Sequence, residues 1–215
     1  MSDISLWMWV GFLLAAYSVI ANDSIQTLGT WIASNKKVNW KIMWGFAGSV
    51  LLFAIWYGWY AYDGSISYGR LNKIPFEGVE WYQALAPAVL LLLTRFGIPV
   101  STSFLVLSAF ASTVVLEKVL MKSMMGYCVA GVAAYVIWIV LTRLLDEGKP
   151  IKESNKIKWR VAQWVTTAFL WWTWLSHDMA NIAVFLPRQL SVDVMIIISV
   201  VFVAGLGWML QHRGG

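Results

Sequence analysis

The amino-acid sequence predicts an all-α protein, a multi-pass transmembrane helical bundle of about seven spans. Hydrophobic residues make up 60% of the 215 positions and charged residues only 13%, whereas a soluble domain normally carries about 25% charged residues to keep its surface solvated. Apolar stretches recur that are each long enough to cross a bilayer, which takes about 20 helical residues. Segments of alternating polarity, which are typical of transmembrane β-barrels, are not visible.

The apolar stretches give the expected order of the spans along the chain. They are 6–33, 42–61, 81–96, 99–117, 123–145, 160–186 and 192–210. The first and sixth are long and carry polar clusters at 22–24 and 176–178, so we expect both to be broken helices. The third and fourth are separated only by residues 95–99, which predicts either a tight helical hairpin or a re-entrant loop.

The charges predict how the spans are oriented. The net charge of +5 comes from residues in short connections between apolar runs, which indicates membrane orientation rather than nucleic-acid binding. Lysines and arginines concentrate in 34–41 and 146–160, which we expect on the cytoplasmic side, while the more acidic connection 62–80 lies outside. The N-terminus is then outside, and we expect the protein in the cell membrane.

Tryptophan is unusually frequent, with 15 residues. Many lie near the ends of expected spans: Trp7, Trp9, Trp31, Trp40, Trp56, Trp59, Trp81, Trp159 and Trp208. We expect them to form the aromatic belts at the two membrane interfaces.

Two acidic residues in oppositely directed spans predict an internal symmetry. Asp23 is followed three residues later by Gln26, and Asp178 by Asn181, so each pair places a carboxylate and an amide on one helix face. Two such faces on antiparallel spans are typical of an inverted repeat with a binding site near the bilayer midplane. We divide the chain into a first repeat, a cytoplasmic basic loop and the start of a second, incomplete repeat, at residues 1–145, 146–159 and 160–215.

The two acids are candidates for ion binding. A carboxylate at the bilayer centre costs about 2.5 kcal/mol or more, so chance explains them poorly. They are either held by hydrogen bonds between helices, or they bind a cation or carry a proton. Hard cations such as sodium favour carboxylate, amide and carbonyl oxygens, and the candidate sodium ligands are Asn22, Asp23, Asp178 and Asn181. Apart from this coupling ion, sodium or a proton, no cofactor is expected.

Residues 99–103 read Pro-Val-Ser-Thr-Ser and form a second polar element. Hydroxyl residues after a proline cap the start of a helix, and the free backbone N–H groups there attract an anion. Ser101, Thr102 and Ser103 are therefore candidate anion ligands. A plain N-cap at the membrane interface explains these residues equally well. His177 is either a proton relay or a hydrogen-bonded structural histidine.

Other functional classes find little support in the sequence. Two histidines and one cysteine give no metal-ligand cluster and no nucleophile–base pair, so we do not expect an enzyme. A retinal-binding photoreceptor needs a lysine in its last span to form a Schiff base, and residues 192–210 contain none.

Three motifs resemble signatures of the inorganic phosphate transporter (PiT) family. Residues 21–30, Ala-Asn-Asp-Ser-Ile-Gln-Thr-Leu-Gly-Thr, are similar to its first signature, G-A-N-D-x-x-N followed by Gly-Thr. Residues 99–103 are similar to its P-V-S-T-T element. Residues 176–181, Ser-His-Asp-Met-Ala-Asn, with Pro187 nearby, are similar to its second signature, S-H-G-A-N-D-V-A-N followed by Gly-Pro. The three occur in the family's order and span most of the chain.

The resemblance implies symport of inorganic phosphate with sodium or protons through an inverted-repeat fold. The half-sites that it implies consist of Asn22, Asp23 and Gln26 with Ser101, Thr102 and Ser103 beside them, and of Asp178 and Asn181. The departures leave the substrate open: Ile20 stands where the family has glycine, Gln26 and His177 where it has asparagine, and Phe104 where it often has histidine.

The family normally carries a second P-V-S-T-T-like element after the second signature, and this chain ends at Gly215 without one. We therefore expect a fragment, or a short relative that completes its site by association. The alternative functions are transport of a related oxyanion such as sulfate, and a non-transporting membrane subunit. The expected partners are the anion and membrane lipid, and a homo-oligomer is left open.

Overall fold

The computed structural model describes residues 5–96, 101–144 and 153–213, and this part of the chain contains helices and turns but no strand. One π-helix interrupts the α-helical pattern near the N-terminus. The elements are α1 (Leu6–Ser18), the π-helix η1 (Val19–Asp23), α2 (Ser24–Ser34), α3 (Trp40–Ala61), α4 (Trp81–Ala84), α5 (Ala86–Arg95), α6 (Thr102–Ser108), α7 (Thr113–Leu144), α8 (Glu153–Ala183) and α9 (Val192–Arg213).

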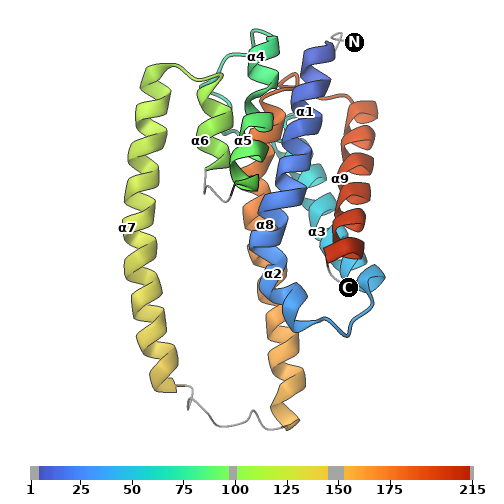
Figure 1. The fold of residues 1–215 in the computed structure, drawn as a ribbon, viewed down its shortest axis with the longest axis vertical. Coiled ribbons are helices and arrows are strands. Elements are labelled where there is room, and N and C mark those ends of the chain that lie inside the picture. Colours follow the sequence, from blue (N-terminus) through green and yellow to red (C-terminus); the bar gives the residue numbers. More distant parts are fainter. Residues whose placement is uncertain (1–4, 97–100, 145–152, 214–215) are drawn as a thin grey trace.

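The long helices lie side by side and alternate in direction (Figure 1). Those long and apolar enough to cross a membrane are Leu6–Ser34, Trp40–Ala61, Val115–Arg143 and Val192–His212. Helix α8 has 31 residues and packs against α2 and α3, but it is more polar than these four. The predicted all-α membrane bundle is confirmed.

The segment between α3 and α7 differs from the two spans predicted there. Helix α5 has only 10 residues and α6 only 7, which corresponds to roughly 15 Å and 10 Å of helix. The predicted span 99–117 is wrong, because α6 ends at Ser108 and a turn precedes α7. Helix α5 descends to about half the height of the bundle and α6 returns upward (Figure 1). The two short helices therefore form a hairpin that enters the bundle from one end, although residues 97–100 lie outside the described part.

The predicted helix breaks are also corrected. The first span stays helical through 22–24, where η1 inserts extra backbone into the turn and the Ser24 hydroxyl donates to the carbonyl of Val19 (3.1 Å). Helix α8 continues through 176–178 without interruption. No glycine or proline lies between Glu153 and Ala183, so nothing in that sequence disfavours helical backbone.

The bundle centre is formed by α3, α8 and α9, and tryptophans link these helices. The indole N–H of Trp44 donates to Val203 (2.8 Å), that of Trp56 to Ser199 (3.1 Å) and that of Trp59 to Leu190 (2.8 Å). The predicted aromatic belt is wrong for Trp31, which is buried at 1% exposure, whereas Trp56 and Trp59 are partly buried. In a medium without water an indole N–H needs a protein partner; α9 supplies it to Trp44 and Trp56, and the connection before α9 supplies it to Trp59.

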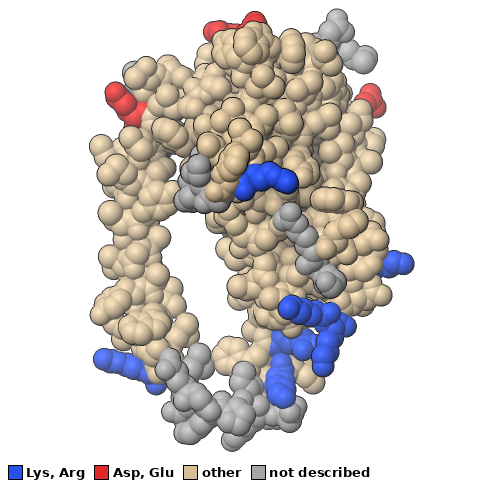
Figure 2. All heavy atoms as spheres, viewed as in Figure 1, with Lys and Arg blue, Asp and Glu red and all other residues tan. Residues whose placement is uncertain are grey.

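The two ends of the bundle differ in charge. On the face shown in Figure 2, acidic groups lie at the upper end and most basic groups toward the lower end. The connection 34–41 is at the lower end, and the connections 62–80 and 184–191 are at the upper end (Figure 1), as the loop charges predict. The predicted basic loop 146–159 is too long, because α8 already begins at Glu153, after Gly148 and Pro150; residues 145–152 lie outside the described part.

Hydrogen bonds hold the connections at the upper end together. The Arg188 guanidinium donates to two carbonyls. One is that of Ile74 in the connection 62–80 (3.1 Å), and the other is that of Ala183 at the end of α8 (3.3 Å). Burial lowers the pKa of Arg188 from its ordinary value. The backbone N–H of Leu190 also donates to the carbonyl of Gly64 (2.9 Å). These bonds fix the connection 62–80 against the bundle.

Candidate functional site

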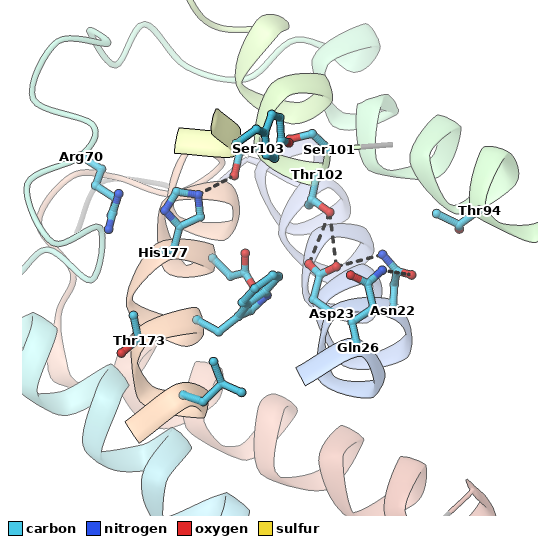
Figure 3. Close-up of a pocket in the computed structure, with 14 residues that line it drawn as sticks. Asn22, Asp23, Gln26, Arg70, Thr94, Ser101, Thr102, Ser103, Thr173 and His177 are labelled. Carbon is cyan, nitrogen blue, oxygen red and sulfur yellow. Dashed lines mark hydrogen bonds between the residues drawn. The ribbon is translucent and has the colours of Figure 1, made fainter. Parts of the chain in front are cut away.

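A cavity of about 770 Å³ lies between η1, α6 and α8 (Figure 3). Its walls carry hydroxyl, amide and carboxyl groups together with a few aromatic and apolar side chains. The lining residues are Asn22, Asp23, Gln26, Arg70, Thr94, Ser101, Thr102, Ser103, Tyr127, Leu170, Thr173, Trp174, His177 and Asp178. Seven of the eight sequence-predicted site residues line it, and the eighth, Asn181, does not.

The first wall comes from η1 and the start of α2. The Asn22 amide donates to Asp23 Oδ1 (2.9 Å), and the Gln26 amide donates to Asn22 Oδ1 (3.2 Å). The Asp23 side chain is only 4% exposed. These three residues form a continuous hydrogen-bonded chain that ends on a buried carboxylate.

The second wall is the N-terminal turn of α6. Thr102 Oγ1 lies 3.3 and 3.4 Å from the two carboxyl oxygens of Asp23 and donates to that group. Ser103 Oγ lies 3.2 Å from His177 Nε2 on α8. Ser101 is the N-cap, and its hydroxyl accepts from the N–H of Phe104 (3.3 Å). The hairpin thereby contacts both η1 and α8, and Ser101 both caps α6 and lines the cavity.

The third wall is the last third of α8. Asp178 and Asn181 are 3% and 1% exposed, and the Asn181 amide donates to Asp178 Oδ1 (3.4 Å). Among the residues described, Asp178 Oδ2 and Asn181 Oδ1 have no hydrogen-bond partner. Buried polar atoms are nearly always paired. Two unpaired oxygens one helical turn apart therefore indicate a place that a bound group would complete.

The electrostatics of the cavity are dominated by two acids. Asp23 and Asp178 are close enough to interact with each other, and Arg70 interacts with Asp178 and His177. Like charges in a buried site are unfavourable unless a positive charge compensates them. The predicted convergence of the two acidic spans thus has a structural counterpart: both carboxylates face one cavity from antiparallel helices (Figures 1 and 3).

Several lining residues were not predicted. Thr173 and His177 are four residues apart on α8, so helical spacing from His177 would have identified Thr173. Arg70 comes from the connection 62–80 and Tyr127 from α7, and neither has a sequence signal that points to the cavity.

The donor set fits a small hard cation better than a transition metal. Within the described residues no group of three or more His, Cys, Asp or Glu could hold a metal ion. The unpaired oxygens of Asp178 and Asn181 are the ligand types that sodium prefers. Asn22 Oδ1 already accepts from Gln26, and the Asp23 carboxylate already accepts from two side chains. These oxygens therefore have fewer free lone pairs for a cation than those of Asp178 and Asn181.

Comparison with known proteins gives no relative: no protein-family model, no curated protein and no solved structure matches this chain. The similarity to phosphate transporters therefore depends on the three motifs alone.

Proposed function

We propose that this protein is a cation-coupled symporter of inorganic phosphate in the cell membrane. The observation that carries the proposal is the shared cavity, in which the buried carboxylates Asp23 and Asp178 lie opposite the hydroxyls of α6. Burial of two acids in a membrane protein is costly and is typical of ion or proton pathways. The motif resemblance to phosphate transporters points in the same direction.

The coupling between cation and anion follows from charge. Two neighbouring carboxylates repel a phosphate ion as long as no cation lies between them. A sodium ion or a proton at Asp178 and Asn181, assisted by Asn22 and Asp23, reduces that repulsion. Phosphate then binds among Ser101, Thr102, Ser103 and His177, and movement of the helices around the site exposes it to the other side.

The same acids favour phosphate over sulfate. At neutral pH inorganic phosphate carries at least one proton and donates a hydrogen bond to a carboxylate, whereas sulfate has no proton to donate. A site with buried acceptors binds a donor-bearing ligand and rejects an analogue that would leave them unpaired. Asp23 and Asp178 provide such acceptors on the cavity wall.

The test is phosphate uptake into liposomes that contain the purified protein, driven by a sodium or a proton gradient. We expect Asp23→Asn and Asp178→Asn to abolish uptake, because each removes a charge that binds the cation. Asp193→Asn is the matched control, since Asp193 is an exposed acid in the first turn of α9 and does not line the cavity. Unchanged uptake by both cavity variants would exclude the proposal.

A second candidate is a non-transporting subunit of a membrane assembly, and α7 favours it. This helix packs chiefly against α6, none of its membrane window is buried, and an open gap separates its lower part from the rest of the bundle (Figure 2). A partner chain, including a second copy, would cover it. Cation-dependent phosphate binding by the purified protein separates the two candidates, because a purely structural subunit binds none.

A further inference from the structure

One positive side chain lines the cavity, and it does not belong to any of the predicted motifs. Arg70 is the only lysine or arginine among the described lining residues. It comes from the connection 62–80 at the upper end of the bundle and extends toward His177 (Figures 1 and 3). Its charge acts on His177 and on Asp178. The three groups therefore share one part of the cavity.

The segment that carries Arg70 is folded onto the bundle. Its neighbours Ile66, Ser67 and Leu71 are each at most 1% exposed. The Tyr68 hydroxyl donates to the carbonyl of Ala54 on α3 (2.6 Å), and burial raises the pKa of Tyr68, so this donor stays protonated. Because its flanking residues are anchored, the Arg70 backbone is held in place beside the cavity.

A tight turn directs Arg70 away from this anchored core. Tyr68 and Gly69 both have left-handed backbone, with φ of 55° and 71°, and the N–H of Arg70 donates to the carbonyl of Ser67 (3.1 Å). The turn buries Leu71 on one side and leaves Arg70 exposed on the other. A solvated arginine at the rim of a polar cavity is available to a ligand, since no described carboxylate forms an ion pair with it.

We propose that Arg70 binds the anion on the outer side of the cavity, next to His177 and Ser103. A guanidinium offers two parallel N–H donors that match two oxygens of a tetrahedral oxyanion. Ser103 and His177, already 3.2 Å apart, supply further hydrogen-bonding groups on the same side. This inference rests on the proposed transport of phosphate, and it adds a residue that neither the motifs nor the resemblance contains.

Arg70 also makes the charge of the cavity asymmetric, with a positive group on one side and the acids on the other. The acids and the amides lie on η1, α2 and α8, while the guanidinium lies on the connection 62–80, whose charges predict the outer side. An anion that arrives from the outer side meets the positive charge before it meets Asp178. Attraction at the rim raises the local anion concentration and offsets repulsion from the acids deeper in the cavity.

The test compares phosphate binding to four purified full-length proteins at a fixed sodium concentration: wild type, Arg70→Gln, Arg70→Lys and Lys73→Gln. We expect Arg70→Gln to weaken phosphate binding about tenfold or more, because a charge-assisted, bidentate contact is lost. Arg70→Lys should have a smaller effect, since it keeps the charge and loses the planar fork. Lys73→Gln removes the same charge from an exposed position three residues away that does not line the cavity, and it should bind as wild type does.

Liposome uptake, measured in parallel, separates this inference from the proposed function. If wild type transports phosphate and Arg70→Gln has the same Kd and KM as wild type, Arg70 is not a ligand and the transport proposal stands. If wild type binds phosphate through Arg70 but takes none up, Arg70 is a ligand and the transport proposal fails. A wild type that binds no phosphate overturns both. An equal loss in Lys73→Gln would reduce Arg70 to one of several surface charges and overturn the inference. Thermal unfolding of each variant checks that the fold is retained.

Discussion

Replacing Thr102 with valine tests whether the hairpin tip belongs to the ion site. Thr102 is buried, and its hydroxyl donates to the Asp23 carboxylate from the first turn of α6. Valine has nearly the same shape but no donor. The substitution leaves Asp23 with the Asn22 amide as its remaining side-chain partner, while the packing of α6 is little changed.

The expected magnitude follows from the geometry. A hydrogen bond to a charged group contributes about 1.5–3 kcal/mol, and the 3.3 and 3.4 Å distances are long for a hydroxyl donor. We therefore take the lower value, which corresponds to about a tenfold change in an equilibrium constant. Because the substitution disturbs Asp23, which assists cation binding at Asp178 in the proposed mechanism, we expect Thr102→Val to raise the sodium or proton concentration needed for half-maximal phosphate uptake about tenfold.

Two further variants make this prediction specific. Thr102→Ser keeps the hydroxyl and should behave nearly as wild type does. Thr94→Val also alters a threonine that lines the cavity, but the Thr94 hydroxyl donates to Leu91 within its own helix (3.0 Å), so the cation dependence should not change. If Thr102→Val retains wild-type cation dependence, or if Thr94→Val changes it equally, the hydrogen bond to Asp23 has no role in coupling.

Two predictions concern packing and membrane exposure. A Cβ on Gly11 would overlap the buried ring of Phe185, whereas a Cβ on Gly29 meets no atom of another element within 4 Å. We expect Gly11→Ala to lower the free energy of unfolding by about 1–3 kcal/mol, and Gly29→Ala to leave it unchanged or raise it slightly. Unfolding in detergent measures both. Cys128 lies exposed on α7 and should react only with membrane-permeant maleimides, while Thr173→Cys in a Cys128→Ala background should react with a charged maleimide and be protected by phosphate. Labelling of Cys128 by the charged reagent would contradict its lipid exposure.

The sequence was a good guide to the helices and to the acids, for physical reasons. A helix that faces lipid must be apolar over its whole length, so α3, α7 and α9 stand out in composition alone. A carboxylate is rare in such surroundings, and this rarity pointed to Asp23 and Asp178. Both predictions depend on residue type, which can be read without knowing what packs against what.

The predictions that failed depend on packing or on backbone detail. The π-helix at Val19–Asp23 changes the backbone hydrogen-bond spacing without a distinctive residue type. The polar cluster of α8 suggested a break, yet Ser176 bonds to the carbonyl of Thr173 within the helix (2.8 Å), and no glycine or proline interrupts it. Trp56 faces α9 because Ser199 offers an acceptor there, and Arg70 is recruited from a connection whose path over the bundle has no periodic signal.

The two cavity acids are not equivalent, and this difference assigns their roles. The Asp23 carboxylate accepts hydrogen bonds from Asn22 on its own element and from Thr102 on α6, which offset part of the cost of burying its charge and join α6 to the first span. Asp178 Oδ1 accepts a 3.4 Å bond from the Asn181 amide, while Asp178 Oδ2 and Asn181 Oδ1 are buried and have no hydrogen-bond partner among the described residues. A sodium ion between these two oxygens, or a proton on Oδ2 donated to the amide oxygen, satisfies both atoms at once. Within the proposed symport we therefore assign the coupling ion to Asp178, and we assign to Asp23 the contact between the first span and α6.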